Sequence, residues 1–468
     1  MGSLSLALPS APSSSESPRT PPEIIDAVLD ELASDKKDIT SYHALLRCSL
    51  VSREVSSRCR MHIFQEINLG WSKDALTSQD SLSLTSGTVS GLVNILVTNP
   101  SLSNHILILR INPAYFHSNL DGDKLCDNLP LLLKQMPRLR AFRLTSGANP
   151  DAPSLPWSWF TPEAQTAIER CVARPTITCV EFRGFSRFPI TLIYSCSPSL
   201  TTLYLSRTLP VTVDPAEQAA GSPADAPQPP SWSLQRLVCQ NALPLLRSAI
   251  QHDAFNTDRT PFGNLQHLNV AILTHADSLL VAPLLAQAAE SMRTLEVSFS
   301  LRTGESEFKT NWVQLPSLRR LHVAVHCKEV QDAPGFPPEV PNLIHGVSQG
   351  QTSVVNLSFH TGCQMTYTPV AAGQTLLGDS QGWRELRDTL TSDRLPRLST
   401  LRISISVFLL PQEPDVEITR ETCQEFERRL SHELLGRFSS HGRGLSLSIS
   451  VQTLREIFPI GMEGWHEE

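Results

Sequence analysis

The pattern closest to a catalytic motif is Gly378-Asp379-Ser380-Gln381-Gly382, which has the G-x-S-x-G spacing of a hydrolase nucleophile elbow. That motif requires a buried strand before the serine and a helix after it. The preceding residues, TPVAAGQTLL, show only a weak strand pattern, and a capping Asp or Ser explains the following helix equally well. We therefore interpret the segment as a loop that leads into a helix, and keep a serine enzyme as a distant alternative.

Two histidines lie four residues apart in the alternating segment LHVAVHC. His322 and His326 would share one face of a strand, so a joint metal site with the adjacent Cys327 is geometrically possible. Histidine pairs are more common on solvated strand faces, and we expect that arrangement here. No dinucleotide- or phosphate-binding glycine pattern is present, and we expect neither a metal nor a cofactor.

The ten cysteines predict packing rather than metal binding or redox chemistry. No two of them are separated by two residues, so the spacings of zinc ribbons and thioredoxin-type sites are absent. Most lie in apolar runs, where a free cysteine behaves as a small hydrophobic residue. We expect free thiols in a reducing compartment.

Composition and charge argue against several classes of protein. The 468 residues carry 39 Lys and Arg against 46 Asp and Glu, so the formal net charge is −7. A dedicated nucleic-acid binder needs clustered positive charge, which this balance does not indicate. No apolar run reaches the length of a membrane span, and the first residues lack the basic start of a secretory signal. We expect a chain of the cytoplasm, the nucleus or both.

Residues 20–69 have the pattern of a helical domain, after a Ser/Pro-rich tail at 1–19 that we expect to be disordered. Thr20 suits the N-cap of a first helix, with Pro21 at its first position and Glu23 returning a hydrogen bond to the cap. The apolar residues of this helix form one stripe: Ile24, Ile25, Val28, Leu29 and Leu32. The stripe is either the core of a small helical unit or a surface that binds a partner.

Two further helices are expected in this domain. One covers 41–48, and Ser52 should cap the other. The apolar face of the last helix carries Val55, Cys59, Ile63 and Phe64. About fifty residues form a marginal core alone, so the three helices should pack against another part of the chain.

The helical domain resembles the F-box, in particular the F-box-like segments common in fungal proteins. The resemblance is carried by TPPEIIDAVLDEL, then LLRCSLVSREV and then HIF, in the order and at the spacing of that family. The matching positions are Pro22, Glu23, Ile24, Leu29, Leu32, Cys48, Leu50, Val51, Ser52 and Arg53. Thr20 stands where the family usually has Leu, and Val55 where it usually has an aromatic residue, which removes area from a hot spot.

The resemblance implies a partner and a set of contact residues. In the F-box family part of this surface binds the Skp adaptor subunit of a cullin–RING ubiquitin ligase. The residues that the resemblance assigns to this contact are Pro22, Glu23, Ile24, Leu29, Leu32, Leu50, Val51, Arg53 and Val55. It implies no catalytic residue on this chain, because a separate conjugating enzyme would transfer ubiquitin.

Residues 70–468 contain a degenerate repeat. The pattern apolar-x-x-apolar-x-apolar recurs ten times, and its first position advances 292 residues in nine steps, a mean period of about 32 residues. The apolar triples are Ile106/Leu109/Ile111, Leu139/Phe142/Leu144, Ile177/Val180/Phe182, Leu200/Leu203/Leu205, Leu234/Leu237/Cys239, Leu265/Leu268/Val270, Met292/Leu295/Val297, Leu318/Leu321/Val323, Val354/Leu357/Phe359 and Leu398/Leu401/Ile403. Several follow helical patterns, such as KLCDNLPLLLKQM, ADSLLVAPLLAQAAE and GWRELRDTL.

A helix followed by a short strand, cycled at this period, is the signature of a solenoid with one parallel sheet. The segments PRLRAFRL and PSLRRLHV resemble leucine-rich repeats most clearly. We therefore predict an α/β fold, in which a small three-helix F-box precedes a right-handed α/β leucine-rich-repeat-like solenoid. Pro-rich inserts at 213–231 and 328–342 should be surface loops. A helix in ETCQEFERRLSHELLGRF and a strand at 445–451 should cap the end of the array.

Candidate substrate contacts follow from the alternation of side chains along a strand. The residue between the second and third apolar positions must point away from the core, toward the open face of the sheet. These residues are Arg110, Arg143, Glu181, Tyr204, Val238, Asn269, Glu296, His322, Ser358 and Arg402. We select Arg143, Tyr204 and His322, because the open sheet face of leucine-rich-repeat proteins commonly binds partners. The mixed charge of the row favours a protein ligand over nucleic acid.

The densest aromatic cluster is Trp157-Ser158-Trp159-Phe160. We expect it to fill the core, and the alternative is a loop that anchors a partner.

The leading hypothesis is a substrate receptor, without enzymatic activity of its own, in a Skp–cullin–F-box ubiquitin ligase. The F-box would bind the Skp adaptor, and the solenoid would bind a protein substrate that the sequence does not identify. Holding both would raise the concentration of substrate lysines near the conjugating enzyme. The competing hypothesis is a leucine-rich-repeat-like binding scaffold with no link to ubiquitin, whose helical segment only caps the solenoid.

Overall fold

The computed structural model describes most of the chain between its two terminal segments. The described ranges are 21–34, 39–70, 83–84, 88–114, 122–146, 154–209, 232–247, 250, 261–273, 275–301, 312–331, 339–348, 354–367, 381–391, 395, 397–411, 418–438 and 444–453. The predicted tail at 1–19, the insert at 213–231 and residues 378–380 of the elbow-like motif lie outside these ranges.

The fold is α/β, with helices and parallel strands that alternate along the chain. The helices are α1 (Pro22–Ser34), α2 (Ile39–Cys48), α3 (Arg53–Phe64), α4 (Thr88–Thr98), α5 (Pro100–Ser103), α7 (Gly122–Lys134), α8 (Pro162–Val172), α9 (Ile190–Tyr194), α12 (His275–Ala288), α13 (Glu339–Ser348), α14 (Gln381–Thr391) and α15 (Arg420–Phe438), with 3-10 turns η2 (Trp157–Trp159) and η4 (Leu243–Leu246). None of the helices in these ranges is long and apolar enough to cross a membrane.

Thirteen of the described strands form one sheet, and a small second sheet pairs β5 (Leu155–Pro156) with β7 (Phe185–Ser186). Apart from β2, which lies at the edge beside β1, the strands of the large sheet follow one another in chain order. They are β1 (Glu66–Leu69), β2 (Ser83–Leu84), β3 (Ile108–Ile111), β4 (Ala141–Thr145), β6 (Cys179–Arg183), β8 (Thr202–Ser206), β9 (Arg236–Gln240), β10 (His267–Ile272), β11 (Thr294–Leu301), β12 (Arg320–Gln331), β13 (Asn356–Tyr367), β14 (Thr400–Pro411) and β15 (Gly444–Thr453).

The second and third positions of the ten apolar triples lie on ten successive strands, and the first position lies just before each strand. Every neighbouring pair of these strands is parallel, as predicted. Each side chain of each triple is at most 3% exposed. The second and third positions of one triple align with those of the next, for example Leu203 with Leu237 and Leu205 with Cys239. One continuous core therefore runs beneath the sheet, built by nearest-neighbour packing.

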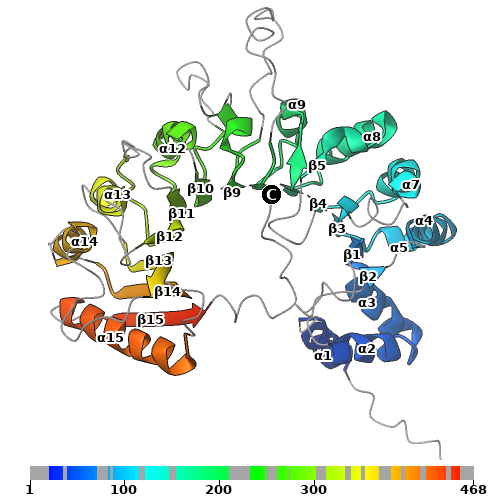
Figure 1. The fold of residues 1–468 in the computed structure, drawn as a ribbon. Coiled ribbons are helices and arrows are strands. Elements are labelled where there is room, and N and C mark those ends of the chain that lie inside the picture. The colour runs from blue at the N-terminus through cyan, green and yellow to red at the C-terminus, as the bar shows by residue number, and fades with distance from the viewer. Residues whose placement is uncertain are drawn as a thin grey trace, which may run out of the picture.

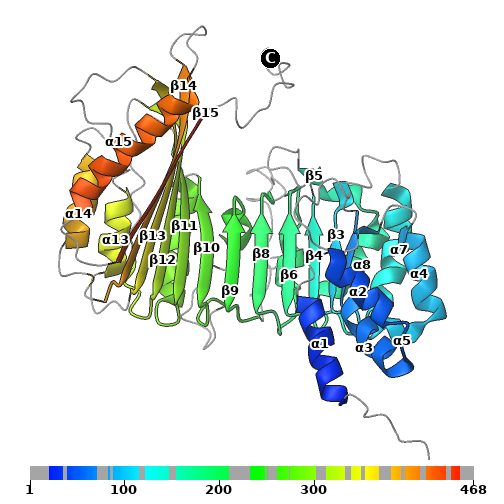
Figure 2. The same cartoon turned by 90° about the horizontal axis from the view of Figure 1, so that it is seen from below.

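The sheet is curved, with its strands on the inner side and the helices from α4 to α15 on the outer side (Figure 1). A helix is about 10 Å wide, whereas neighbouring strands are only about 4.8 Å apart, so the helical side needs the longer arc. Figure 2 shows the strands side by side and longest near the C-terminal end, where β12, β13 and β14 have 12 residues each. None of the described helices from α4 to α15 covers the inner face of the sheet.

One backbone carbonyl per unit joins each strand to the next. The Arg319 carbonyl accepts hydrogen bonds from the N–H groups of Val355 and Asn356, at 2.9 and 3.1 Å. The same double acceptance recurs at ten positions, from the Gln65 carbonyl to that of Val355. Because both donors belong to the start of the following strand, this contact fixes the register between units.

The three N-terminal helices pack on a small core of their own, which consists of Leu29, Ala33, Leu45 and Cys59. Ser52 caps α3 as predicted, since its hydroxyl accepts a hydrogen bond from the Val55 N–H at 3.2 Å. Phe64 at the end of α3 packs instead against the core of the large sheet. The helical unit is thus packed against the large core. A unit of this size buries too little surface to be stable alone, so this contact was expected.

Three predicted boundaries were wrong. Helix α1 begins at Pro22, so Pro21 takes the position before the helix, with its carbonyl accepting from the Ile24 N–H, and Thr20 lies outside the described residues. The helical domain does not extend to residue 69, because Glu66–Leu69 is strand β1. The segment 328–342 is not wholly a loop: β12 continues to Gln331, and α13 buries Val340 in the core. A proline in the first turn of a helix needs no N–H partner, which is why Pro341 did not prevent α13.

Aromatic packing confirms the core interpretation of the tryptophan cluster. Trp157 is 5% and Phe160 1% exposed, with ring centroids 5.1 Å apart. The Trp157 ring also contacts Phe182, Phe185 and Phe188, with centroid separations between 5.0 and 6.2 Å. The cluster therefore fills the space between the large sheet and the small β5–β7 sheet.

Candidate functional site

Exposed hydrophobic side chains gather on the N-terminal helices. Thirteen large hydrophobic residues of the described chain are exposed, and six of them fall between residues 21 and 64. These six form what we name the apolar surface: Ile24, Val28, Leu46, Leu50, Val51 and Met61. Single exposed hydrophobic residues are ordinary on a protein, but six of them in one small unit make these helices the candidate binding region.

The two most exposed members occupy the turn between α2 and α3. Leu50 is 86% and Val51 76% exposed. Their backbone N–H groups donate to the carbonyls of Arg47 and Cys48, both at 3.0 Å. An ordered turn thus holds two apolar side chains in water, where their burial contributes nothing to the stability of the folded chain.

The structure separates the predicted adaptor contacts into two groups. Pro22, Glu23, Ile24, Leu50, Val51 and Arg53 are exposed. Leu32 and Val55 are half-buried against the small core, and Leu29 is only 2% exposed. Leu29 thus lies in the small core and not among the exposed residues, so a direct contact of this side chain with an adaptor is not expected from the folded unit.

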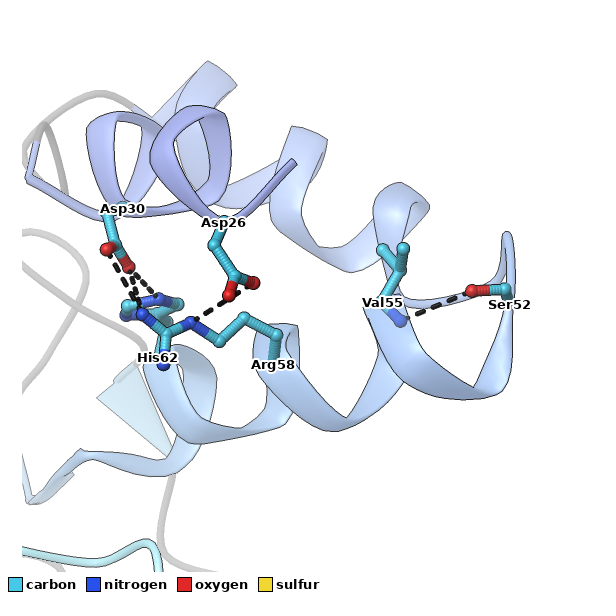
Figure 3. Close-up of polar contacts among 6 residues, drawn as sticks. All are labelled: Asp26, Asp30, Ser52, Val55, Arg58 and His62. Carbon is cyan, nitrogen blue, oxygen red and sulfur yellow. Dashed lines mark hydrogen bonds and ion pairs between the residues drawn. The ribbon is translucent and has the colours of Figure 1, made fainter. Parts of the chain in front are cut away.

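Polar contacts fix α1 against α3 (Figure 3). The Arg58 guanidinium donates to both carboxylate oxygens of Asp30, at 2.9 and 3.1 Å, and its Nε lies 3.6 Å from Asp26 Oδ1. His62 Nε2 is 2.9 Å from Asp30 Oδ1. These four side chains join the helix that carries Ile24 and Val28 to the helix that follows the exposed turn.

The open face of the sheet carries the row that the sequence predicted, here named the central row. Its ten residues are aligned partner to partner, from Arg110 beside Arg143 to Ser358 beside Arg402. All are half-buried except Arg402, which is exposed. Asn68 on β1 and Ser446 on β15 extend the row at its two ends, and neither was predicted.

Each of the three selected substrate candidates already has a partner within the chain. Arg143 Nε lies 3.7 Å from Glu181 Oε2, and His322 Nδ1 is 2.6 Å from the Ser358 hydroxyl. The guanidinium of Arg236 lies over the Tyr204 ring, with its Cζ 5.6 Å from the centre of the ring. The three residues are on the open face as predicted. Arg143 and His322 contact other residues of the central row, Glu181 and Ser358. Tyr204 contacts Arg236, a residue that was not predicted.

That neighbour, Arg236, belongs to a second row of side chains on the same face of the sheet. This row lies two residues before the central row on each strand. Arg236, His267 and Arg320 are exposed there on β9, β10 and β12, and we name them the basic cluster. Sequence reasoning missed them because it read one position per strand. The signal was present, since the residue directly before the second apolar position also faces away from the core.

The charges of the basic cluster act on His267, which lies among them. Burial lowers the pKa of His267, and the positive charges of Arg236, Arg320 and Arg293 lower it further, while Glu296 opposes them. Burial also lowers the pKa of His322, while Glu296 opposes this shift and His360 adds a smaller lowering contribution. Glu296, for its part, accepts a hydrogen bond from the Asn269 amide at 2.6 Å.

Three chemical alternatives are a metal site, reactive cysteines and a serine enzyme. No group of three His, Cys, Asp or Glu residues within the described ranges could hold a metal ion. Burial raises the pKa of the Cys171 and Cys196 thiols to about 12, so both stay protonated at neutral pH. Of the elbow-like motif, Gln381 is the first residue of α14, which agrees with a segment that leads into a helix.

Comparison with known proteins gives no relative. No family model matches the chain, and no curated protein matches it in sequence.

Proposed function

We propose that this chain is the substrate receptor of a Skp–cullin–F-box ubiquitin ligase. In this proposal residues 22–64 are an F-box-like unit that binds the Skp adaptor, and the curved sheet is a leucine-rich-repeat-like solenoid that binds a protein substrate. The chain acts by holding its two partners close together, and the chemistry of ubiquitin transfer belongs to a separate enzyme.

One observation carries the proposal: the exposed turn at Leu50 and Val51 coincides with the part of the F-box pattern that reads LVSR in this sequence. At 86% and 76% exposed, this hydrophobic pair contributes little to the core of the folded chain and is free to contact a partner. Burial of a Leu and a Val side chain in an interface contributes about 1.5–3 kcal/mol each. The turn is therefore the expected centre of the adaptor contact.

The two halves of the molecule divide the work in a way that suits a receptor. The N-terminal helices lie at one end of the curved sheet, so the proposed adaptor contact and the proposed substrate face belong to different parts of the molecule (Figure 1). The packing of Phe64, the last residue of α3, on the large core supports a fixed geometry between the two. A fixed geometry is what presentation of a substrate to a separate enzyme needs.

A second function is favoured by a different observation. Leu29 is buried, Val55 is half-buried, and Phe64 packs on the large core, as expected of helices that merely close the end of the sheet. In that case the chain is a leucine-rich-repeat-like binding scaffold without a link to ubiquitin. Under this alternative the apolar surface has no adaptor to bind.

Co-purification separates the two functions. The full chain carrying an affinity tag is mixed with purified Skp adaptor and then with the adaptor–cullin–RING assembly. The receptor proposal expects a stoichiometric complex in both mixtures, and the scaffold alternative expects none. A complex that forms equally well after Leu50→Asp and Val51→Asp together would argue against the contact we assign.

A further inference from the structure

The basic cluster is a continuous feature of the inner face. Arg236 aligns with His267, His267 with Thr294, and Thr294 with Arg320. The four residues therefore occupy one level on four adjacent strands, and the backbones of Arg236 and Arg320 are about 14 Å apart. A peptide of several residues, laid across the strands, spans that distance.

The positive charges of the cluster are not neutralised by the chain. Within the described residues, Arg236, Arg320 and the nearby Arg293 have no ion pair. The first strands of the sheet differ, since Arg110 pairs with Glu66 at 2.9 Å and Arg143 with Glu181. Among the described inner-face side chains of β9, β10, β11 and β12 the one carboxylate is Glu296, which binds Asn269.

This cluster stands in a chain whose formal net charge is −7. Like charges gathered on one face repel one another and weaken the folded chain, so they call for an anionic ligand. The ring of Tyr204 beneath Arg236 orders one guanidinium, and an ordered guanidinium fork matches a carboxylate with two parallel hydrogen bonds. Between His267 and Arg320 the face offers the small and neutral side chain of Thr294.

We propose that Arg236, His267 and Arg320, with Arg293 beside them, bind an acidic segment of a partner protein through its Asp and Glu side chains. The negative charge of the whole chain disfavours a long polyanion such as nucleic acid, which needs contacts to many phosphates. This inference rests on the proposed receptor function because it names the class of substrate. The contact itself needs no adaptor, so each can be tested without the other.

The test measures binding of a fluorescein-labelled oligoglutamate peptide to the full purified chain by fluorescence anisotropy at low ionic strength. Three proteins are compared: the wild type, the variant Arg236→Gln/Arg320→Gln, and a control with the same charge loss, Arg170→Gln/Arg420→Gln. Arg170 and Arg420 are exposed on the outer helices α8 and α15. All four arginines are exposed, so circular dichroism and thermal unfolding should be unchanged.

The proposal expects the peptide to bind the wild type and the control alike, and the cluster variant about tenfold more weakly. Added salt should weaken binding to the wild type, because exposed charges are screened. Equal loss in both variants would overturn the proposal, as would no binding to the wild type. Tighter binding of a single-stranded oligonucleotide or a phosphoserine peptide of the same net charge would also overturn it, since the ligand would then be of another class.

The outcome for the adaptor is read separately. If the peptide fails to bind while the Skp adaptor still does, the receptor proposal stands and this inference falls. If the peptide binds and the adaptor does not, the inner face binds acidic proteins in a molecule that is not a ligase subunit.

Discussion

The Arg58 guanidinium of α3 donates hydrogen bonds to both carboxylate oxygens of Asp30 in α1, at 2.9 and 3.1 Å. Asp30 is half in water, with 51% of its side chain exposed, and Arg58 has 32% exposed. Solvent therefore screens the attraction, and geometry rather than large stability is what the pair contributes. It fixes how the helix with Ile24 and Val28 lies against the helix that follows the exposed turn.

A double-mutant cycle should show that the Asp30–Arg58 pair contributes little to the free energy of unfolding. We expect Asp30→Asn and Arg58→Gln to have a coupling free energy of less than about 1 kcal/mol in urea unfolding. Adaptor affinity should fall in the single variants, because α1 is no longer held at one angle. A coupling of several kcal/mol would show instead that the pair carries the stability of the unit.

Leu29 and Leu50 both match the predicted F-box pattern but differ in burial, so their substitutions should differ in their effect on stability. Leu29→Ala should lower the free energy of unfolding by about 2–5 kcal/mol, because it opens a cavity in the small core. Leu50→Ala removes a side chain that is 86% exposed and should change stability by less than about 0.5 kcal/mol. Limited proteolysis within residues 21–64 reports on this unit directly. Similar costs at the two positions would mean that Leu50 is not exposed in solution.

Gly184 is a position that only glycine suits. Its φ of 75° is in the left-handed region, and a Cβ there would lie 2.3 Å from the Ser146 carbonyl oxygen. Gly184→Ala should therefore destabilise the chain by more than about 1 kcal/mol. Gly91 in α4 is the matched control, since nothing lies within 4 Å of a Cβ there and Gly91→Ala should stabilise the helix by about 0.5–1 kcal/mol. Urea midpoints that move in the same direction would contradict the geometry.

His322 predicts how stability depends on pH. Burial holds its pKa below the usual value of about 6.5, so the folded chain binds its proton less readily than the unfolded chain. The contribution to stability is complete above pH ~6.5 and is lost as pH falls below it. We expect His322→Gln to reduce the fall in unfolding free energy between about pH 7 and pH 5. An NMR titration that places the His322 pKa at or above about 6.5 would reverse the sign.

Much of the fold could be read from the sequence because burial imposes a period. The triples such as Leu203/Leu205 and Leu321/Val323 had to face one way on each strand, which fixed both the register and the direction of the central row. Ser52 was predictable as a cap because its hydroxyl chemistry is local. The strand at Glu66–Leu69 was missed because four residues carry too little pattern to separate them from the end of a helix.

The candidate sites were harder to predict. An apolar stripe on α1 does not say which side of it meets a core, so Leu29 and Val28 looked alike although one is 2% and the other 54% exposed. The basic cluster depends on which charges lack a partner across neighbouring strands. That property involves residues from Tyr204 to Arg320 and is not a local feature of the sequence.

The central claim is that the turn at Leu50 and Val51 binds the Skp adaptor. Its most direct measurement is the dissociation constant of purified adaptor for three full-length proteins: the wild type, Leu50→Asp/Val51→Asp, and the control Ile95→Asp/Val97→Asp. The control replaces two exposed apolar residues of α4, which are 46% and 54% exposed, outside the apolar surface. A charge placed in a desolvated contact is costly, so the account predicts equal binding by wild type and control and no detectable binding by the turn variant. Failure of the wild type to bind, or undiminished binding by a folded turn variant, would contradict it.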